Sequence, residues 1–299
     1  MSLIIRPARA DDLAPAQELV ARSINELTLR HGFGAIATAR SPDFQAFCLR
    51  DDPRGLWVAE DGGQLAGYAL SWVCGQLWFL AELFVAPGRQ GQGIGGQLLA
   101  RTLEHAVQAG AAERCLITFA FNLVSQSLYA RHGLLPRVPI HLCSAAPESL
   151  AGRTPHSALR ATPIQDSVDD LDALRRIDLA SLGVPREKHH RYLLAVPGMQ
   201  GVFLDDSDER VGYAYVAPTG HIGPLAVVHA QAMPAAFHAA LTLAAAGEGE
   251  QVSVFVPGTS EALAAAARLG LRFALPMVLM SEHDFGDWRR YLPRNPGFM

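Results

Sequence analysis

A cluster of glycines carries the most specific chemical signal in this sequence. Four glycines fall within six residues: Gly91, Gly93, Gly95 and Gly96. They follow an apolar run over 77–85, which predicts a buried strand, and they precede apolar residues at helical spacing over 92–109. Glycine lets a backbone approach a ligand closely, and the unpaired amides at a helix start attract phosphate. The order strand, glycine loop, helix therefore predicts a phosphate site, to which Arg89 and Arg101 could add positive charge.

The spacing of the loop narrows the kind of phosphate. No Gly-Lys-Ser or Gly-Lys-Thr follows, so the loop is not a P-loop. Gly91, Gly93 and Gly96 fit the dinucleotide spacing G-x-G-x-x-G, but no acidic residue closes a second strand about 20 residues later. A dinucleotide site is therefore disfavoured.

Glu82 is the carboxylate that could act as a base. It lies inside the predicted strand, and strand alternation places it on the same face as Leu80 and Phe84. A carboxylate among such neighbours has a raised pKa, which suits a general base that takes a proton from an ammonium near neutral pH. A glutamate at a solvated strand edge, or one with a structural hydrogen bond, fits the same pattern equally well.

Three polar residues share one face of the helix predicted over 122–131. Asn122, Ser125 and Tyr129 stand at positions i, i+3 and i+7. Such a stripe can hold a ligand, or it can meet water with Tyr129 as an interface aromatic. The spacing by itself leaves both interpretations open.

Two motifs resemble those of the GNAT superfamily of N-acetyltransferases. The segment 90–95 is similar to the family's acyl-CoA diphosphate loop, Gln/Arg-x-x-Gly-x-Gly/Ala, through Gln90, Gly93 and Gly95. The segment 83–87 resembles the family's preceding strand end. The segment 122–133 is similar to a second family motif, Asn-x-x-Ala/Ser-x-x-Leu-Tyr-x-x-x-Gly. The resemblance covers about residues 3–143.

This resemblance implies transfer of an acetyl group from acetyl-CoA to a primary amine by direct attack in a ternary complex. It makes Glu82 the base, acting directly or through water, and Tyr129 the acid that protonates the leaving thiolate. Asn122 would contact the pantetheine arm and Ser125 the diphosphate side, while the backbone at 84–85 would polarise the acetyl carbonyl. The implied cofactor-binding residues are Phe84, Val85, Gln90, Gly91, Gln92, Gly93, Ile94, Gly95, Gly96, Asn122 and Ser125.

The remaining pattern predicts an α+β fold, duplicated in tandem. Strand and helix signals in the first half predict a mixed, mostly antiparallel sheet flanked by helices, and the second half repeats them faintly. The segment 55–59, for example, is echoed by 201–205. The predicted parts are a catalytic GNAT domain over 1–146, a linker over 147–157, a degenerate GNAT-like domain over 158–284 and a C-terminal tail over 285–299.

The second copy lacks the glycine loop. Its counterpart, 227–236, contains no glycine, and Pro234 removes one backbone N–H. We therefore expect this copy to hold no CoA diphosphate. A catalytically decayed CoA-binding or sensor protein is the alternative to an enzyme with one working site.

The composition of the chain argues against some classes of binding partner. The chain has 299 residues, 49% of them hydrophobic, and a formal net charge of −4, which argues against nucleic acid. No apolar run approaches the length of a membrane span and no signal peptide is recognised, so we expect a cytoplasmic protein without a membrane partner. The cysteines have no metal or CxxC spacing and predict buried free thiols; they are Cys48, Cys74, Cys115 and Cys143.

The histidines also lack metal spacing, and we expect the pair His189 and His190 on a solvated surface and no metal in the protein. The acceptor, a small-molecule or peptide amine, is expected beside residues 24–45. His31, Arg40 and Asp43 are candidate contacts there. The sequence leaves open whether the protein is a monomer or a homodimer.

Overall fold

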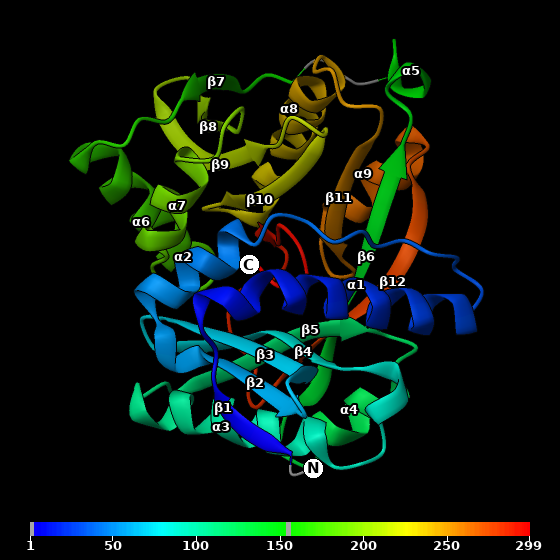
Figure 1. Ribbon diagram of the computed structural model, residues 1–299. Coiled ribbons are helices and arrows are strands. Elements are labelled where there is room, and N and C mark those ends of the chain that lie inside the picture. The colour runs from blue at the N-terminus through cyan, green and yellow to red at the C-terminus, as the bar shows by residue number, and fades with distance from the viewer. Residues whose placement is uncertain (1–2, 154–156) are drawn as a thin grey trace. The chain divides into compact units, whose positions relative to one another are not determined.

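The computed structural model describes residues 3–153 and 157–299, and the chain divides into two compact units. Unit 1 comprises Met1–Ile117, Phe121–Leu135 and Met280–His283. Unit 2 comprises Thr118–Ala120, Pro136–Leu279 and Asp284–Met299. Figure 1 shows the helices and strands of both.

The strands β1 to β5 of unit 1 are consecutive neighbours in the sheet, and helices cover both of their faces. The elements of unit 1 are β1 (Ile4–Pro7), η1 (Ala10–Asp12), α1 (Leu13–Arg30), α2 (Asp43–Asp51), η2 (Pro53–Gly55), β2 (Leu56–Asp61), β3 (Gln64–Cys74), β4 (Leu77–Val85), η3 (Pro87–Arg89), α3 (Ile94–Gln108), β5 (Glu113–Phe119) and α4 (Leu123–Ala130). The strand order is β1-β2-β3-β4-β5. The first three pairs are antiparallel and β4–β5 is parallel, so the predicted mixed, mostly antiparallel sheet is confirmed.

The two faces of this sheet are covered by different helices (Figure 1). On one face, Ile94 and Leu98 of α3 pack against the small residues Ala66 and Ala69 of β3. Gly67 lies on that face too, because a Cβ there would meet Leu98 at 2.8 Å. The opposite face is covered by α1 and α2. The sheet is therefore enclosed by helices at its centre, and polar groups there must find partners from them.

A β-bulge in β4 decides which face Glu82 uses. Leu70 pairs with Glu82, but the next residue, Ser71, pairs with Leu80, so Ala81 is an extra residue in β4. Paired residues share a face while neighbours on one strand point to opposite faces. Glu82 therefore points away from Leu80, toward α1 and α2. The prediction that Glu82 and Leu80 share a face is wrong, because the bulge interrupts the alternation; Phe84 does share the face of Glu82.

The same bulge ends the pairing between β4 and β5. Their ladder runs from Leu77↔Glu113 to Leu80↔Leu116, while β4 continues to Val85. Among the described residues no other strand pairs with this part of β4 on that side. Beyond the bulge, one edge of β4 is therefore open.

Unit 2 repeats the same order of elements. They are β6 (Leu135–Ala145), α5 (Pro147–Leu150), β7 (Arg160–Pro163), α6 (Val168–Ser181), α7 (Glu187–Leu194), β8 (Gln200–Asp206), β9 (Glu209–Val216), β10 (His221–Val227), η4 (Ala230–Ala232), α8 (Met233–Ala245), β11 (Val252–Pro257), α9 (Glu261–Leu269), β12 (Arg272–Ser281) and β13 (Tyr291–Leu292). The order β7-α6-α7-β8-β9-β10-α8-β11 matches β1-α1-α2-β2-β3-β4-α3-β5. The fold is α+β and duplicated in tandem, as predicted.

The units divide the chain differently from the predicted boundaries. The strand expected to complete the first domain, β6, pairs antiparallel with β11 from Ile140↔Pro257 to Ala145↔Val252 and so lies in unit 2. Residues 280–283 lie with unit 1, where the Glu282 N–H donates to the Arg114 carbonyl at 3.1 Å. These boundaries are set by pairing between strands that are far apart in the sequence. Local composition does not determine them.

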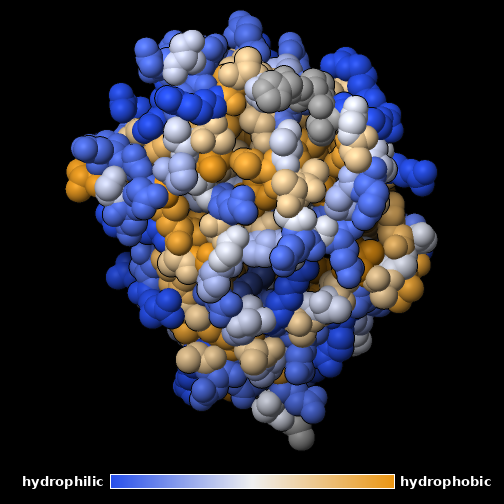
Figure 2. Space-filling view, turned by 90° about the horizontal axis from the view of Figure 1, so that it is seen from above, coloured by the Kyte–Doolittle hydropathy of each residue, from blue (hydrophilic) through white to orange (hydrophobic). Residues whose placement is uncertain are grey.

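The predicted linker and tail are also part of unit 2. Within 147–157, α5 is a short helix whose Leu150 is buried in the core of unit 2, while residues 154–156 lie outside the described residues. Within the tail, β13 pairs with β10. No helix in the described ranges is long and apolar enough to cross a membrane. On the face shown in Figure 2, hydrophilic residues surround and interrupt the apolar ones.

Candidate functional site

Glu82 lies in a polar pair beneath α2. The Gln45 Nε2 donates a hydrogen bond of 2.8 Å to Glu82 Oε1. The second carboxylate oxygen, Oε2, is buried and has no hydrogen-bond partner among the described residues. Burial raises the pKa of Glu82 to about 7, against the opposing effect of the Gln45 and Gln17 amides. The group can therefore exchange a proton near neutral pH, and one of its oxygens is available to accept one.

Tyr68 shares this interior. It pairs with Phe84 across β3 and β4, is fully buried, and its hydroxyl has no hydrogen-bond partner in the part of the chain that the structure describes. Burial, and then the negative charge of Glu82, raise its pKa well above its usual range. Tyr68, Gln45 and Gln17 could not be recognised from the sequence, because a single polar residue in an apolar helix or strand face carries no spacing signal.

Tyr129 belongs to a chain of hydrogen bonds along α4. The Asn122 Nδ2 donates to Ser125 Oγ at 2.9 Å, and Asn122 Oδ1 caps the helix by accepting from the Ser125 N–H at 3.2 Å. Tyr129 is buried, and burial raises its pKa, opposed by a hydrogen bond with Ser125. The structure thus brings the three predicted residues together. The Tyr129 hydroxyl is therefore protonated at neutral pH, which is the form that can donate a proton.

The glycine loop presents its backbone to open space. Gly91 and Gly93 both have φ of 77°, which side-chain-bearing residues rarely adopt, and Gly93 caps α3. A Cβ built at Gly91, Gly93 or Gly96 would meet no atom within 4 Å. The first bond of α3 joins the Gln97 N–H to the Gly93 carbonyl at 3.2 Å, so the amides of 94–96 lie in the unpaired first turn. This is the geometry of an anion site.

Three side chains of the loop region have positions that the sequence did not indicate. The side chain of Ile94 is buried in the core, so only its amide faces the loop. Arg89 is engaged by Asp61 at 2.6 Å and by Gln92 at 3.1 Å. Arg101 pairs with Glu104 at 3.0 Å and lies over the Trp57 ring. Arg101 therefore adds no charge to the loop, because it sits two turns further along α3.

The open edge of β4 leads from the loop toward Glu82. The Ala86 N–H donates to the Ala66 carbonyl at 2.9 Å, so alternate peptide groups point to β3. The Phe84 carbonyl likewise lies against Gly67, at 3.2 Å from where a Cβ would stand. The backbone N–H and carbonyl of Val85 therefore point to the open edge. There the carbonyl accepts hydrogen bonds from the Gln90 and Ser23 side chains, both at 3.3 Å. Of the two predicted backbone contacts, the peptide groups of Val85 face the opening and those of Phe84 face β3.

The candidate acceptor contacts lie in the segment from the end of α1 to the first residue of α2. His31 packs against the Phe121 ring with centroids 4.8 Å apart, Arg40 is exposed, and Asp43 accepts from the Ser41 hydroxyl at 2.7 Å. Asn25 of α1 holds the segment by accepting from the backbone N–H of residues 36 and 37. The segment is thus anchored to α1 rather than free.

Unit 2 has the same strand geometry, but its edge is occupied. The register of β10 against β9 shifts between Ile222 and Leu225, and the β10–β11 ladder ends at Ile222↔Val254. Beyond it, β13 pairs with β10 through Leu225↔Leu292. The backbone of residues 293–294 passes so closely that a Cβ at Gly223 would stand 2.8 Å from the Arg294 Cα. In unit 2 the C-terminal segment therefore occupies the edge of β10. The corresponding edge of β4 in unit 1 has no strand partner among the described residues.

Unit 2 also contains a buried ionic network. Asp178 accepts from Arg186 at 2.9 Å and from Tyr213 at 2.6 Å, and its other oxygen lies 3.0 Å from His190 Nε2. Burial alone would raise the pKa of Asp178, but Arg186 and His190 outweigh it and hold the pKa below its usual range. The prediction that His189 and His190 are solvated is wrong: both are buried under this network.

Other expectations concern cysteines and metals. All four cysteines are free and buried, which confirms that prediction. Within residues 3–153 and 157–299, no three His, Cys, Asp or Glu side chains are grouped so that they could hold a metal ion.

Part of the chain is similar to known proteins. Residues 21–134 match the model of the acetyltransferase (GNAT) family. A mycothiol acetyltransferase from Streptomyces bingchenggensis is 32% identical over 112 residues, which are 33% of this chain and 36% of that protein. The chain thus spans about a third of the length of this curated relative.

Solved structures resemble the whole chain. An N-acetyltransferase related to GCN5 from Sphaerobacter thermophilus aligns with a TM-score of 0.64 at 16% identity, over 93% of this chain and 95% of that one. A tandem GNAT protein from the clavulanic acid biosynthesis pathway aligns with a TM-score of 0.60 at 18% identity, over 94% and 98%. At these identities the likeness shows the fold alone, and that fold is the tandem GNAT fold.

Proposed function

Because residues 21–134 of this chain belong to the acetyltransferase (GNAT) family, we propose that the protein transfers an acetyl group from acetyl-CoA to a primary amine at the site in unit 1. One observation carries the proposal. A glutamate with a pKa of about 7 lies on the strand whose open edge leads to a glycine loop with unpaired amides.

In the proposed complex the diphosphate of CoA binds to the backbone amides between Gly91 and Gly96. The pantetheine arm then lies along the open edge of β4, where the peptide groups of Val85 take the place of a strand partner. This arrangement brings the thioester toward the middle of β4 and the face that carries Glu82. Asn122 and Ser125 support Tyr129 on α4.

The chemistry needs three proton transfers. Glu82 accepts a proton from the substrate ammonium, directly or through water, and the free amine nitrogen attacks the thioester carbon. The C–N bond forms, the C–S bond breaks, and the leaving thiolate takes the proton of the Tyr129 hydroxyl. The second proton that the nitrogen loses on becoming an amide restores the Tyr129 hydroxyl through water. The Val85 N–H points toward the opening and is positioned to stabilise negative charge on the acetyl oxygen. No covalent enzyme intermediate is required.

The proposal includes one site per chain. In unit 2 the counterpart of the glycine loop has no glycine, and β13 occupies the edge that pantetheine would use. Unit 2 therefore has neither the diphosphate cradle nor the open strand edge.

The test combines binding with turnover. Calorimetry with acetyl-CoA is expected to give one site per chain, and thiol release across a panel of amines should identify an acceptor. Tyr129→Phe should retain acetyl-CoA affinity and lose roughly 10²-fold in kcat, because it removes only the proton donor. Binding without turnover on any amine would favour a CoA sensor, and absence of binding would refute the proposal altogether.

A further inference from the structure

Three buried polar atoms come from the elements around Glu82, and none of them has a hydrogen-bond partner in the described part of the chain. They are the Tyr68 hydroxyl on β3, Oε2 of Glu82 on β4 and Nε2 of Gln17 on α1. The other oxygen of Glu82 accepts from Gln45 of α2 at 2.8 Å. A buried polar group without a partner is costly, so three of them in one region indicate that they share a partner.

The register of the sheet places Tyr68 beside Glu82. Tyr68 pairs with Phe84 and Leu70 pairs with Glu82, so Tyr68 and Glu82 are diagonal neighbours on one face. The negative charge of Glu82 accordingly raises the pKa of Tyr68. The Gln17 amide lies close enough to the carboxylate to lower the pKa of Glu82, although its Nε2 makes no hydrogen bond of normal geometry. The three groups are therefore near one another without being paired.

The chemistry of the three atoms is complementary to one water molecule. A phenol hydroxyl can donate or accept, an amide N–H only donates, and an ionised carboxylate oxygen only accepts. One water can accept from the Gln17 amide and the Tyr68 hydroxyl and donate to Oε2 of Glu82. Buried waters typically make about three hydrogen bonds to groups that otherwise have no partner. The number and the types of these atoms match that pattern.

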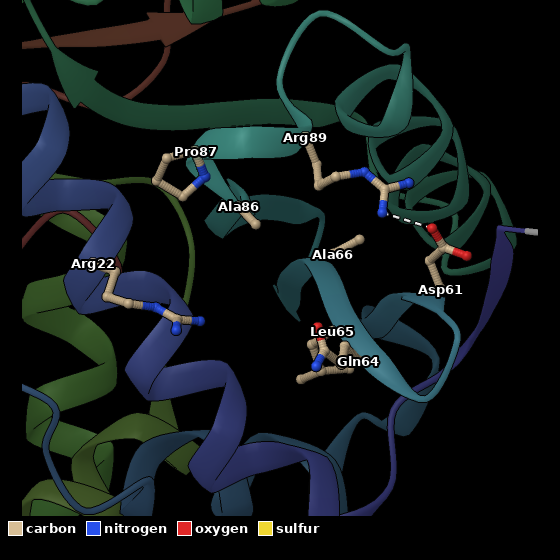
Figure 3. Close-up of a pocket in the computed structure, with 8 residues that line it drawn as sticks. All are labelled: Arg22, Asp61, Gln64, Leu65, Ala66, Ala86, Pro87 and Arg89. Carbon is tan, nitrogen blue, oxygen red and sulfur yellow. Dashed lines mark hydrogen bonds and ion pairs between the residues drawn. The ribbon is translucent and has the colours of Figure 1, made fainter. Parts of the chain in front are cut away.

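The cavity in Figure 3 is a different feature of unit 1. Its volume is about 350 Å³, and residues of α1, of β3 and of the turn after β4 line it, such as Arg22, Leu65 and Pro87. None of the three polar residues described above is among its lining residues. A ligand of this cavity is therefore not the partner that these residues share.

We propose that Tyr68 is a positioning residue for Glu82: its hydroxyl and the Gln17 amide hold the free carboxylate oxygen through one shared water molecule. The importance of this arrangement for catalysis rests on the proposed function, in which Glu82 is the base. Gln45 fixes one carboxylate oxygen and the water fixes the other, so the carboxylate keeps one orientation on β4. Both donors favour the ionised form and partly offset the effect of burial.

Other acids and bases do not obscure this effect. The buried residues of α1 include no acid or base, α2 contributes Cys48, and β3 contributes Tyr68. Cys48 raises the pKa of Tyr68, whereas the pKa of Glu82 is determined by burial and by the two glutamine amides. A change in the titration of Glu82 when Tyr68 is replaced therefore reports on the hydroxyl.

The experiment follows the ionisation of Glu82 by NMR and needs no acceptor. Glutamate labelled with carbon-13 at the side-chain carboxyl is incorporated into the full chain, and the signal of Glu82 is identified by its loss in Glu82→Gln. The titrated proteins are wild type, Tyr68→Phe, Gln17→Met and the control Tyr192→Phe. The control makes the same chemical change on α7 of unit 2. Phenylalanine and methionine preserve most of the side-chain volume, and urea unfolding checks that each variant folds.

Wild type should titrate with a midpoint of about 7. Tyr68→Phe and Gln17→Met should each raise the midpoint by about one pH unit, a tenfold change in the ionisation constant, because the carboxylate loses a donor. Tyr192→Phe should leave it unchanged. Once an acceptor is known, the pH at which kcat/KM reaches half of its plateau should rise by the same amount, while the plateau itself is kept.

Urea unfolding adds a second readout for Tyr68→Phe. A pKa that is raised further makes ionisation of Glu82 still harder in the folded protein, so the unfolding midpoint should fall more at about pH 8.5 than at about pH 5. A hydroxyl without any partner predicts the opposite result. Its removal would then relieve a cost of burial and raise the unfolding midpoint at both pH values.

Three results would overturn the assignment. If Tyr68→Phe leaves the titration of Glu82 at the wild-type midpoint, or raises the urea midpoint at both pH values, the hydroxyl does not hold Glu82. If it lowers the plateau of kcat/KM about a hundredfold without moving the pH profile, Tyr68 contacts the reacting atoms instead. If wild type acetylates no amine, the proposed function fails, while the NMR titration still decides whether Tyr68 holds the carboxylate.

Discussion

Replacing Glu82 with glutamine separates its role as a base from its effect on stability. The glutamine keeps the shape of the side chain and can still contact Gln45, but it cannot take a proton. If Glu82 is the general base, kcat/KM should fall by roughly 10²–10⁴. The wild-type profile should rise with pH through an apparent pKa of about 7, and this rise should vanish in the variant.

The stability effect follows from the same pKa. Burial raises the pKa of Glu82 from 4.5 to about 7, so its ionisation is harder in the folded than in the unfolded protein. The group therefore destabilises the fold progressively as pH rises from about 4.5 to 7, and the cost reaches at most about 3 kcal/mol above that range. Glutamine does not ionise, so Glu82→Gln should become more stable than wild type at high pH.

Urea unfolding at about pH 5 and about pH 8.5 measures this difference without any knowledge of the acceptor. The free energy of unfolding of Glu82→Gln, relative to that of wild type, should increase by about 2–3 kcal/mol from the lower to the higher pH. Glu18→Gln is the matched control, because Glu18 is exposed on α1 and its replacement should give no such growth. A stability difference that stays constant with pH would show that the pKa of Glu82 is not raised by burial, and Glu82 would then not be suited to act as a base near neutral pH.

Three further predictions concern the loop and unit 2. Gly93→Ala should cost about 1 kcal/mol in urea unfolding and weaken CoA at least tenfold by calorimetry, because φ is 77° there; Gly96→Ala, which lies in α3 without a positive φ, should not lower stability. Asp178→Asn should destabilise the protein by about 3–5 kcal/mol in urea, because it leaves Arg186 buried without its counter-charge; a loss below about 1 kcal/mol would contradict this. Gly223→Ala should loosen the C-terminal segment, detected as faster proteolysis of the tail, because its Cβ would overlap the backbone of 293–294; wild-type proteolysis would refute the close packing.

The local parts of the site could be predicted from the sequence. The loop at 90–96 is encoded by glycines between a strand and a helix, and the face shared by Asn122, Ser125 and Tyr129 is encoded by helical spacing. Both depend on neighbours a few residues apart, and the structure places them as expected. The duplication was also visible, because each copy repeats the same short-range pattern.

The sequence by itself determined that this chain has strand, loop and helix in the order that can hold a phosphate, because those features follow from local periodicity and glycine content. Only the tertiary structure decided that Glu82 faces α2 and Gln45, since the bulge at Ala81 exists only in the register with β3. It also decided that β6 lies with β11 and that the C-terminal segment fills the edge of β10. Strand pairing joins residues far apart in the chain, and a strand's own sequence does not specify which partner will satisfy its backbone hydrogen bonds.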